Sequence, residues 1–232
     1  MPEEITIPNY NTTARGLSSS SVDFLARVYE ILYGAFGPQH WWPAETPFEV
    51  AVGAILTQNT NWGNVERAIS NLKNTEALEP HVLHSMPRHE LSALIKPSGY
   101  HNVKAARLKA FIEFLVSRFD GVIENMKAHD ATALRASLLE VKGIGPETAD
   151  SILLYALDKP IFVIDAYTKR ILSRHSILEY KRPYGDFQAL FHNSAIAHAA
   201  YNDYHALFVR LGKYYCKPRP LCDECPLKGI YP

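Results

Sequence analysis

Apolar residues recur three and four positions apart along most of the chain, a spacing that places them on one face of an α-helix. A first helix is expected between the serine run at 18–21 and Gly37. Further helices are expected over 47–57, 61–73, 88–95, 102–119, 131–140, 146–157, 166–175 and, with a break, 186–215. Only residues 161–165 look extended, and a lone strand has no partner with which to pair. The sequence therefore predicts an all-α fold.

The most informative stretch is 138–172, where two short amphipathic helices are joined by the loop residues Lys142, Gly143, Ile144 and Gly145. Glycine suits positions where a backbone turns sharply or approaches a partner closely. Pro146 suits the first position of the second helix, where an amide hydrogen would have no partner anyway. The free amides there predict an anion site that a DNA phosphate fills without reading sequence. An ordinary helical hairpin explains the loop alone equally well.

Asp165 lies 20 residues after Gly145, at the end of the extended segment and directly before a predicted helix. An Asp in this place is most often an N-cap, whose side chain accepts a hydrogen bond from a free backbone amide. The helix start also favours the ionised carboxylate. Such a carboxylate beside a sugar stabilises the charge that develops when a glycosidic bond breaks, or orients the attacking water. Asp165 is therefore both an expected cap and the candidate catalytic residue.

The stretch GIGPETAD at 143–150, followed by VID at 163–165, resembles the helix-hairpin-helix DNA glycosylases, the superfamily of endonuclease III. The resemblance extends from about residue 22 to the end of the chain. It implies an enzyme of base excision repair that flips a damaged base out of double-stranded DNA and uses Asp165 for the chemistry. No membrane partner is implied, and we expect a monomer.

The resemblance also implies an endonuclease III-like, two-lobed helical architecture. The first lobe is expected to be a six-helix barrel over 47–158, which includes the helix-hairpin-helix at about 131–157. The second is expected to combine 18–46 with 159–232.

Glu147 bears on the type of glycosylase. Superfamily members that also nick the strand carry a lysine in the hairpin helix, which attacks the sugar and forms a Schiff base. The resemblance places Glu147 at that position, beside the base pocket, and makes Lys142 a phosphate contact. A carboxylate cannot form an imine, so we expect a monofunctional glycosylase. A lysine from elsewhere would restore lyase activity, and a bifunctional glycosylase/lyase stays an alternative.

Two further segments resemble family loops that enter the DNA. AILTQNTNW at 54–62 matches the segment whose glutamine replaces the flipped base, so Gln58 is the expected plug. GYHNVKA at 99–105 matches the loop that wedges into the opposite strand, so Tyr100 is the expected wedge. Without the resemblance, a helix-end amide and a surface aromatic would be the simpler interpretations.

The segment HWWPAETPF at 40–48 bears on the substrate. Trp41, Trp42 and Pro43 form a rigid aromatic wall, and tryptophan is the strongest neutral partner for a cationic group. Alkylation at N3 or N7 makes a purine cationic and weakens its glycosidic bond. A WWP segment ahead of LTQNT also resembles the 3-methyladenine DNA glycosylases of the endonuclease III type. We expect the substrate to be an alkylated purine. The alternative substrates are thymine or uracil in mismatches, adenine opposite oxidised guanine, and oxidised pyrimidines. The alternative without a role in binding is that the two tryptophans only anchor the core.

All cysteines of the chain fall in its last 17 residues, which favours metal ligation in a reducing compartment over disulfides. The run CKPRPLCDECPLKGIYP resembles the [4Fe-4S] loop of endonuclease III relatives. Cys216, Cys222 and Cys225 match three ligands, but Tyr231 stands at the place of the fourth. A [4Fe-4S] cluster with an incomplete ligand set, a loop without metal, and a zinc site with histidine help all stay open.

Composition changes this picture little. The formal net charge is zero, and only the part after residue 140 is net basic, which gives weak support to a nucleic-acid partner. The apolar runs are too short to cross a bilayer and no signal-peptide pattern is present, so a cytoplasmic location is expected. A non-enzymatic DNA-binding module and a metal-stabilised helical scaffold are the rivals from other classes.

Overall fold

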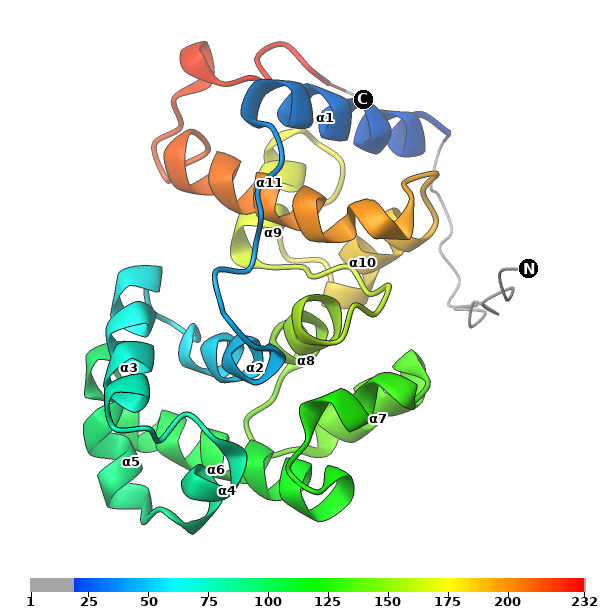
Figure 1. Ribbon diagram of the computed structural model, residues 1–232. Coiled ribbons are helices and arrows are strands. Elements are labelled where there is room, and N and C mark those ends of the chain that lie inside the picture. Colours follow the sequence, from blue (N-terminus) through cyan, green and yellow to red (C-terminus); the bar gives the residue numbers. More distant parts are fainter. Residues whose placement is uncertain (1–18, 232) are drawn as a thin grey trace. The chain divides into compact units, whose positions relative to one another are not determined.

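A computed structural model describes residues 19–231, which form helices and connecting loops (Figure 1). The α-helices are α1 (Ser19–Phe36), α2 (Pro47–Leu56), α3 (Trp62–Asn74), α4 (Pro80–Ser85), α5 (Arg88–Leu94), α6 (His101–Phe119), α7 (Ala131–Glu140), α8 (Pro146–Ser151), α9 (Ala166–Arg174), α10 (Tyr184–His192) and α11 (Tyr201–Tyr214). Short helical turns are η1 (Lys96–Ser98), η2 (Ile123–Ala128), η3 (Ile152–Ala156), η4 (His198–Ala200) and η5 (Cys222–Glu224). No residue from 19 to 231 belongs to a β-strand, so the all-α prediction is confirmed.

The chain divides into two units. The larger unit consists of Pro38–Val163 and His198–Ala206. The smaller unit consists of the chain up to Gly37, Ile164–Ala197 and Leu207–Pro232. The predicted start of the second lobe at residue 18 lies outside the described residues.

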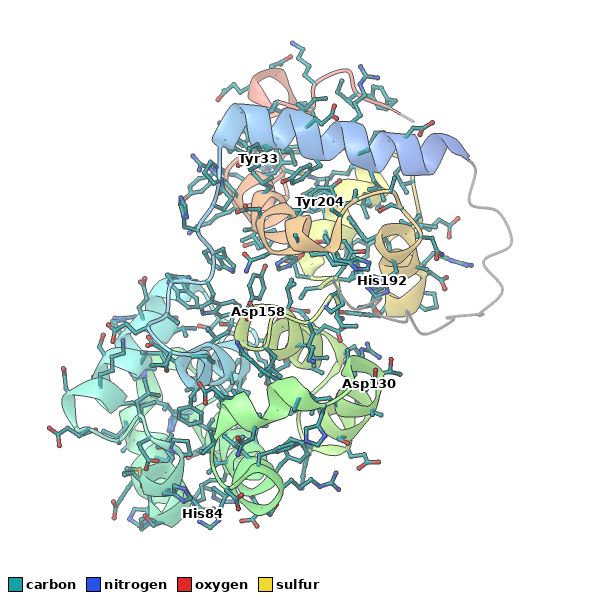
Figure 2. The ribbon with its side chains drawn as sticks, turned by 45° about the vertical axis from the view of Figure 1, so that its right-hand side comes forward. Tyr33, His84, Asp130, Asp158, His192 and Tyr204 are labelled. Carbon is teal, nitrogen blue, oxygen red and sulfur yellow. The ribbon has the colours of Figure 1, made fainter. Side chains whose placement is uncertain are left out.

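Helix starts follow the local sequence. Thr46 caps α2 by accepting a hydrogen bond from the amide of Glu49, and Pro47 fills the first helical position. Asp130 caps α7 by accepting hydrogen bonds from the amides of Thr132 and Ala133, each at 2.9 Å (Figure 2). The caps explain why these predicted boundaries agree with the structure to within one residue.

The core of the larger unit is built around α2. Its sequence PFEVAVGAIL is almost wholly apolar, and a helix that is apolar on all sides has to be buried. All residues from Phe48 to Leu56 are indeed buried, and α2 contacts α3, α6, α8 and η3 (Figure 1). Helix α6 presents a buried stripe with helical spacing: Lys104, Ala105, Leu108, Phe111, Ile112, Leu115 and Phe119.

Two features differ from the sequence prediction. The helix expected over 146–157 is α-helical only to Ser151, and η3 continues it as a π-helical turn that carries Tyr155. Such wider turns occur frequently at functional sites. Helix α4 was not expected, because six residues are too few to show a period. Residues 161–165 have no regular secondary structure, and the backbone of Asp165 at their end is extended.

A buried ion pair joins the two helices of the hairpin. Arg135 of α7 donates from Nε and Nη2 to the two carboxylate oxygens of Asp150 in α8, at 2.6 and 3.1 Å. The Asp150 side chain is completely buried. A buried charge without a counter-charge is costly, so this pair fixes α7 against α8.

In the smaller unit, α9 holds the carboxy-terminal loop. Arg170 donates to the carbonyl groups of Gly212 and Cys216. Arg174 donates to the carbonyl groups of Lys217 and Pro218. The loop is thereby fastened to α9 through its backbone.

No helix within the described residues is long and apolar enough to span a membrane.

We expect Arg135→Met to lower the free energy of unfolding by about 3–5 kcal/mol, because the substitution leaves the Asp150 carboxylate buried without its cation. Chemical denaturation measures the loss. Lys127→Met is the matched control, because it removes a pair with Asp158, whose side chain is 77% exposed, and should cost about 1 kcal/mol or less. Equal losses in the two variants would contradict the role of the buried pair.

Candidate functional site

An aromatic cluster in the larger unit includes the predicted tryptophan pair. The ring centroids of Trp41 and Trp42 lie 5.6 Å apart, and Trp62 lies 5.7 Å from Trp41 and 5.3 Å from Trp42. Tyr155, on the π-helical turn, is 5.3 Å from Trp42, and its hydroxyl hydrogen-bonds to His205. Trp62 was missed from the sequence, where it follows the N-cap Asn61 and looks like an ordinary helix start.

The indole of Trp42 lies close to α2 at Gly53, where a glycine leaves room for it. A Cβ atom at Gly53 would lie 3.2 Å from Nε1 of Trp42 and 3.4 Å from its Cζ2. Nε1 atoms of Trp41 and Trp42 are buried, and neither has a hydrogen-bond partner within the described part of the chain. Buried donors without partners are uncommon and costly. The packing around Trp41 and Trp42 therefore has to offset the cost of burying their two N–H groups.

A cavity of about 120 Å³ adjoins this cluster. Its lining includes Trp42, Pro43, Glu49, Trp62, Glu66 and Lys73. Predicted pocket residues Trp42 and Pro43 therefore share one cavity, and Trp41 contacts its wall. Glu147 does not line it; this side chain is exposed in the first turn of α8.

Carboxylates outnumber ammonium groups around the cavity. Lys73 pairs with Glu49 at 2.9 Å and with Glu45 at 3.0 Å. Burial by itself would lower the pKa of Lys73, but the hydrogen bonds to Glu49 and Glu45 and the negative charges of both together outweigh it, and the pKa is raised. Glu66 accepts a hydrogen bond from Nε1 of Trp62 at 2.7 Å. The lining holds the carboxylates of Glu49 and Glu66 and the ammonium group of Lys73, so this wall has a net negative formal charge.

The hairpin loop has the geometry that its glycines predict. Gly143 has φ +90°, and a Cβ there would lie 2.3 Å from Cγ of Arg107. Ile144 is buried and anchors the loop, whereas the Lys142 side chain is exposed. Gly145 is the N-cap residue of α8.

Gln58 is bonded to this loop. Its Nε2 donates to the carbonyl of Gly143 at 3.2 Å and to Oγ1 of Thr148 at 2.9 Å. Arg107 donates to its Oε1. The C-cap of α2 is Thr57, so Gln58 is not a simple helix-end amide.

Tyr100 is the expected wedge, and its side chain is 72% exposed. Its backbone has φ +45°, a left-handed conformation that is strained for a residue with a side chain. Strain of this kind is most common at functional sites. Asn59, directly after Gln58, has φ +54°.

Lys104 is buried behind both loops. Its Nζ donates to the carbonyl of Leu56 at 2.8 Å and to that of Ser98 at 2.6 Å. Burial, with a smaller contribution from the nearby Arg107 cation, lowers the pKa of Lys104 to about 8.

Asp165 begins α9 in the smaller unit. One carboxylate oxygen accepts a hydrogen bond from the amide of Thr168 at 2.7 Å, so the expected N-cap is confirmed. The side chain is only partly buried. The hydrogen bond holds the carboxylate in a fixed orientation at the positive end of the helix.

The cysteines lie in the smaller unit. Cys216 is buried and lies 3.2 Å from Nη1 of Arg174, Cys222 is exposed, and Cys225 is half-buried. Burial and the two neighbouring cysteines raise the pKa of Cys225. Within the described residues, no three His, Cys, Asp or Glu side chains are arranged to hold a metal ion. A cubane takes four thiolates, so this donor set is incomplete, and the cluster stays a prediction that iron and sulfide analysis decides.

Comparisons with known proteins find relatives that match most of the chain. The Methanocaldococcus jannaschii protein MJ1434, a candidate DNA repair glycosylase, is 45% identical over 91% of this chain and 97% of its own length. The endonuclease III of Thermotoga maritima is 28% identical over 79% of this chain and 81% of its own length. The crystal structure of the H. pylori 3-methyladenine DNA glycosylase, bound to 1,N6-ethenoadenine, is 28% identical with a TM-score of 0.72, covering 83% of this chain and 97% of that one.

A non-covalent endonuclease III–DNA complex shares the fold, with a TM-score of 0.78, 19% identity, and coverage of 93% and 96%. Residues 52–194 match the model of the HhH-GPD superfamily base excision DNA repair protein, which is more than half of the chain. The chain therefore belongs to the HhH-GPD superfamily of base excision DNA repair proteins.

Proposed function

We propose that this protein is a monofunctional DNA glycosylase that hydrolyses the N-glycosidic bond of a flipped alkylated purine, such as 3-methyladenine, in double-stranded DNA. The observation that carries the proposal is the aromatic cavity with a net negative wall. A purine alkylated at N3 or N7 is a flat cation, and indole faces with nearby carboxylates favour such a group over a neutral base. The likeness to the H. pylori 3-methyladenine glycosylase supports the same substrate class.

Trp41, Trp42 and Trp62 would hold the base by stacking, and Pro43 would close the slot. The bound cation needs little acid catalysis, because it leaves the sugar as a neutral base. Selectivity then comes from charge, since an undamaged purine offers no positive charge to Glu49 or Glu66.

Asp165 would carry the chemistry. As the bond to the base breaks, positive charge develops on the deoxyribose, and an ionised carboxylate stabilises it or orients the water that adds to C1′. The hydrogen bond from the Thr168 amide holds the carboxylate in a fixed orientation. The products are the free base and an intact abasic strand.

The DNA would be held by the hairpin and opened by two loops. The amide of Ile144 already donates to the carbonyl of Val141 at 3.0 Å. The amide of Gly145, with the exposed Lys142 beside it, would therefore bind a phosphate without reading sequence. Gln58 would fill the place of the flipped nucleotide, and Tyr100 would wedge into the opposite strand.

Release of a methylated purine from methylated duplex DNA is the expected activity, with chromatography of the freed bases as the measurement. Asp165→Asn should reduce the release at least about 100-fold, because it removes the charge that stabilises the transition state, while it leaves affinity for duplex DNA unchanged. Duplexes with uracil or thymine opposite guanine, adenine opposite 8-oxoguanine, or an oxidised pyrimidine test the alternatives. Full excision by Asp165→Asn would refute its role, and binding without any base release would favour a DNA-binding module.

The product strand should stay intact until alkali is added, because Glu147 cannot form an imine. Borohydride added during the reaction should trap no covalent protein–DNA adduct on a denaturing gel. An adduct would instead support the bifunctional alternative and point to another lysine.

Gly53→Ala should slow excision about tenfold, because the new methyl group displaces the Trp42 indole by a few tenths of an ångström. Single-turnover kinetics measures the change. Gly34→Ala in α1 is the matched control, because a Cβ there meets nothing within 4 Å. Both changes replace glycine by alanine within a helix and gain similar helix propensity. Equal rates in the two variants would show that the position of Trp42 is unimportant.

A further inference from the structure

The buried Lys104 side chain joins the backbones of the two loops that carry Gln58 and Tyr100. Leu56, whose carbonyl it binds, lies two residues before Gln58, and Ser98 lies two residues before Tyr100. Only 1% of Lys104 is exposed. Gln58 and Tyr100 belong to different segments of the larger unit, and Lys104 is the described side chain that bonds to the backbone leading into each.

Burial makes this connection stiff. An ammonium group away from water has to keep its hydrogen bonds to protein acceptors, because each lost partner is paid for in desolvation. Both carbonyl oxygens are therefore held within hydrogen-bond distance of one nitrogen atom. One nitrogen atom thus connects the last residue of α2 to the last residue of η1, the elements that lead into the two loops.

Arg107, one turn further along α6, extends the connection to the hairpin. Its guanidinium donates to the Gln58 amide, and its stem contacts Gly143, which has no side chain in the way. Helix α6 thus supports all three segments to which the proposed function assigns DNA contacts.

We propose that Lys104 is a positioning residue that couples the Gln58 loop to the Tyr100 loop, so that plug and wedge enter the duplex as one rigid unit. The inference rests on the proposed function, because that function gives Gln58 and Tyr100 their roles. Lys104 touches neither DNA nor base and acts only through the two loops.

The first test is a double-mutant cycle of Gln58→Ala and Tyr100→Ala. The probe is a duplex with a tetrahydrofuran abasic-site analogue and 2-aminopurine in the neighbouring position. Fluorescence anisotropy gives the affinity for this duplex relative to an intact one, and 2-aminopurine emission reports unstacking. If the loops act as one unit, the two losses should fall short of additivity by about tenfold, since distant residues without shared partners are otherwise additive. Additive losses would overturn the proposal.

The second test is Lys104→Met, which keeps the length and apolar stem of the side chain. The preference for the abasic duplex should fall about tenfold with unchanged affinity for intact DNA, and the Gln58–Tyr100 coupling should disappear. Lys109→Met is the matched control: Lys109 is on the same helix and also binds carbonyl groups, but those of Leu83, His84 and Met86 around the end of α4. Two outcomes would show that Lys104 only stabilises the fold. One is an equal loss of preference for the abasic duplex in Lys104→Met and Lys109→Met, and the other is Gln58–Tyr100 coupling that persists in Lys104→Met.

Binding and 2-aminopurine emission do not depend on bond cleavage. A protein that distorts the abasic duplex in the expected way but releases no base would refute the proposed function and leave the coupling intact. Excision by the protein together with additive effects of Gln58→Ala and Tyr100→Ala would support the proposed function and refute the coupling by Lys104.

Discussion

The ammonium group of Lys104 is shielded from water and has to take its hydrogen bonds from the protein, and this requirement organises the surface above it. Two carbonyl groups from separate loops meet at its Nζ atom. Arg107 repeats the arrangement one turn later, with the Gln58 amide and the bare backbone of Gly143 as its neighbours. The buried ammonium group of Lys104 thus helps to position exposed loop residues that, on the proposed function, contact DNA.

The helices were readable from the sequence because their apolar stripes and caps are local properties. Thr46 and Asp130 are of residue types that favour helix starts, and in the structure each caps the helix that follows it. Helix α4 is too short to carry a period, and the π-helical turn at Tyr155 breaks no sequence pattern. Such features are set by packing, which a one-dimensional pattern does not record.

The site was readable only in part. Trp41, Trp42 and Pro43 stand together in the chain, and they stand together in space. Trp62, Glu49 and Lys73 join them through the packing of α2 against α3, and none of these is unusual in its own segment. Lys104 resembles any surface lysine in the sequence; only the fold shows that it is buried. In the sequence, Gly53 is a glycine within a helix, which normally lowers helix stability. Only the structure shows that its missing side chain leaves room for the Trp42 indole.

Asp165 caps the start of helix α9, and Arg174 is the last residue of that helix. The residue proposed for catalysis and a residue that anchors the cysteine loop therefore stand at opposite ends of one short helix. A change at Cys216 removes one of the groups to which Arg174 donates, beside the carbonyls of Lys217 and Pro218. On the proposed function, a cysteine replacement that shifts this helix would impair catalysis without the loss of any cluster. Loss of turnover in cysteine variants is therefore no diagnosis of a bound cluster, and iron content has to be measured directly.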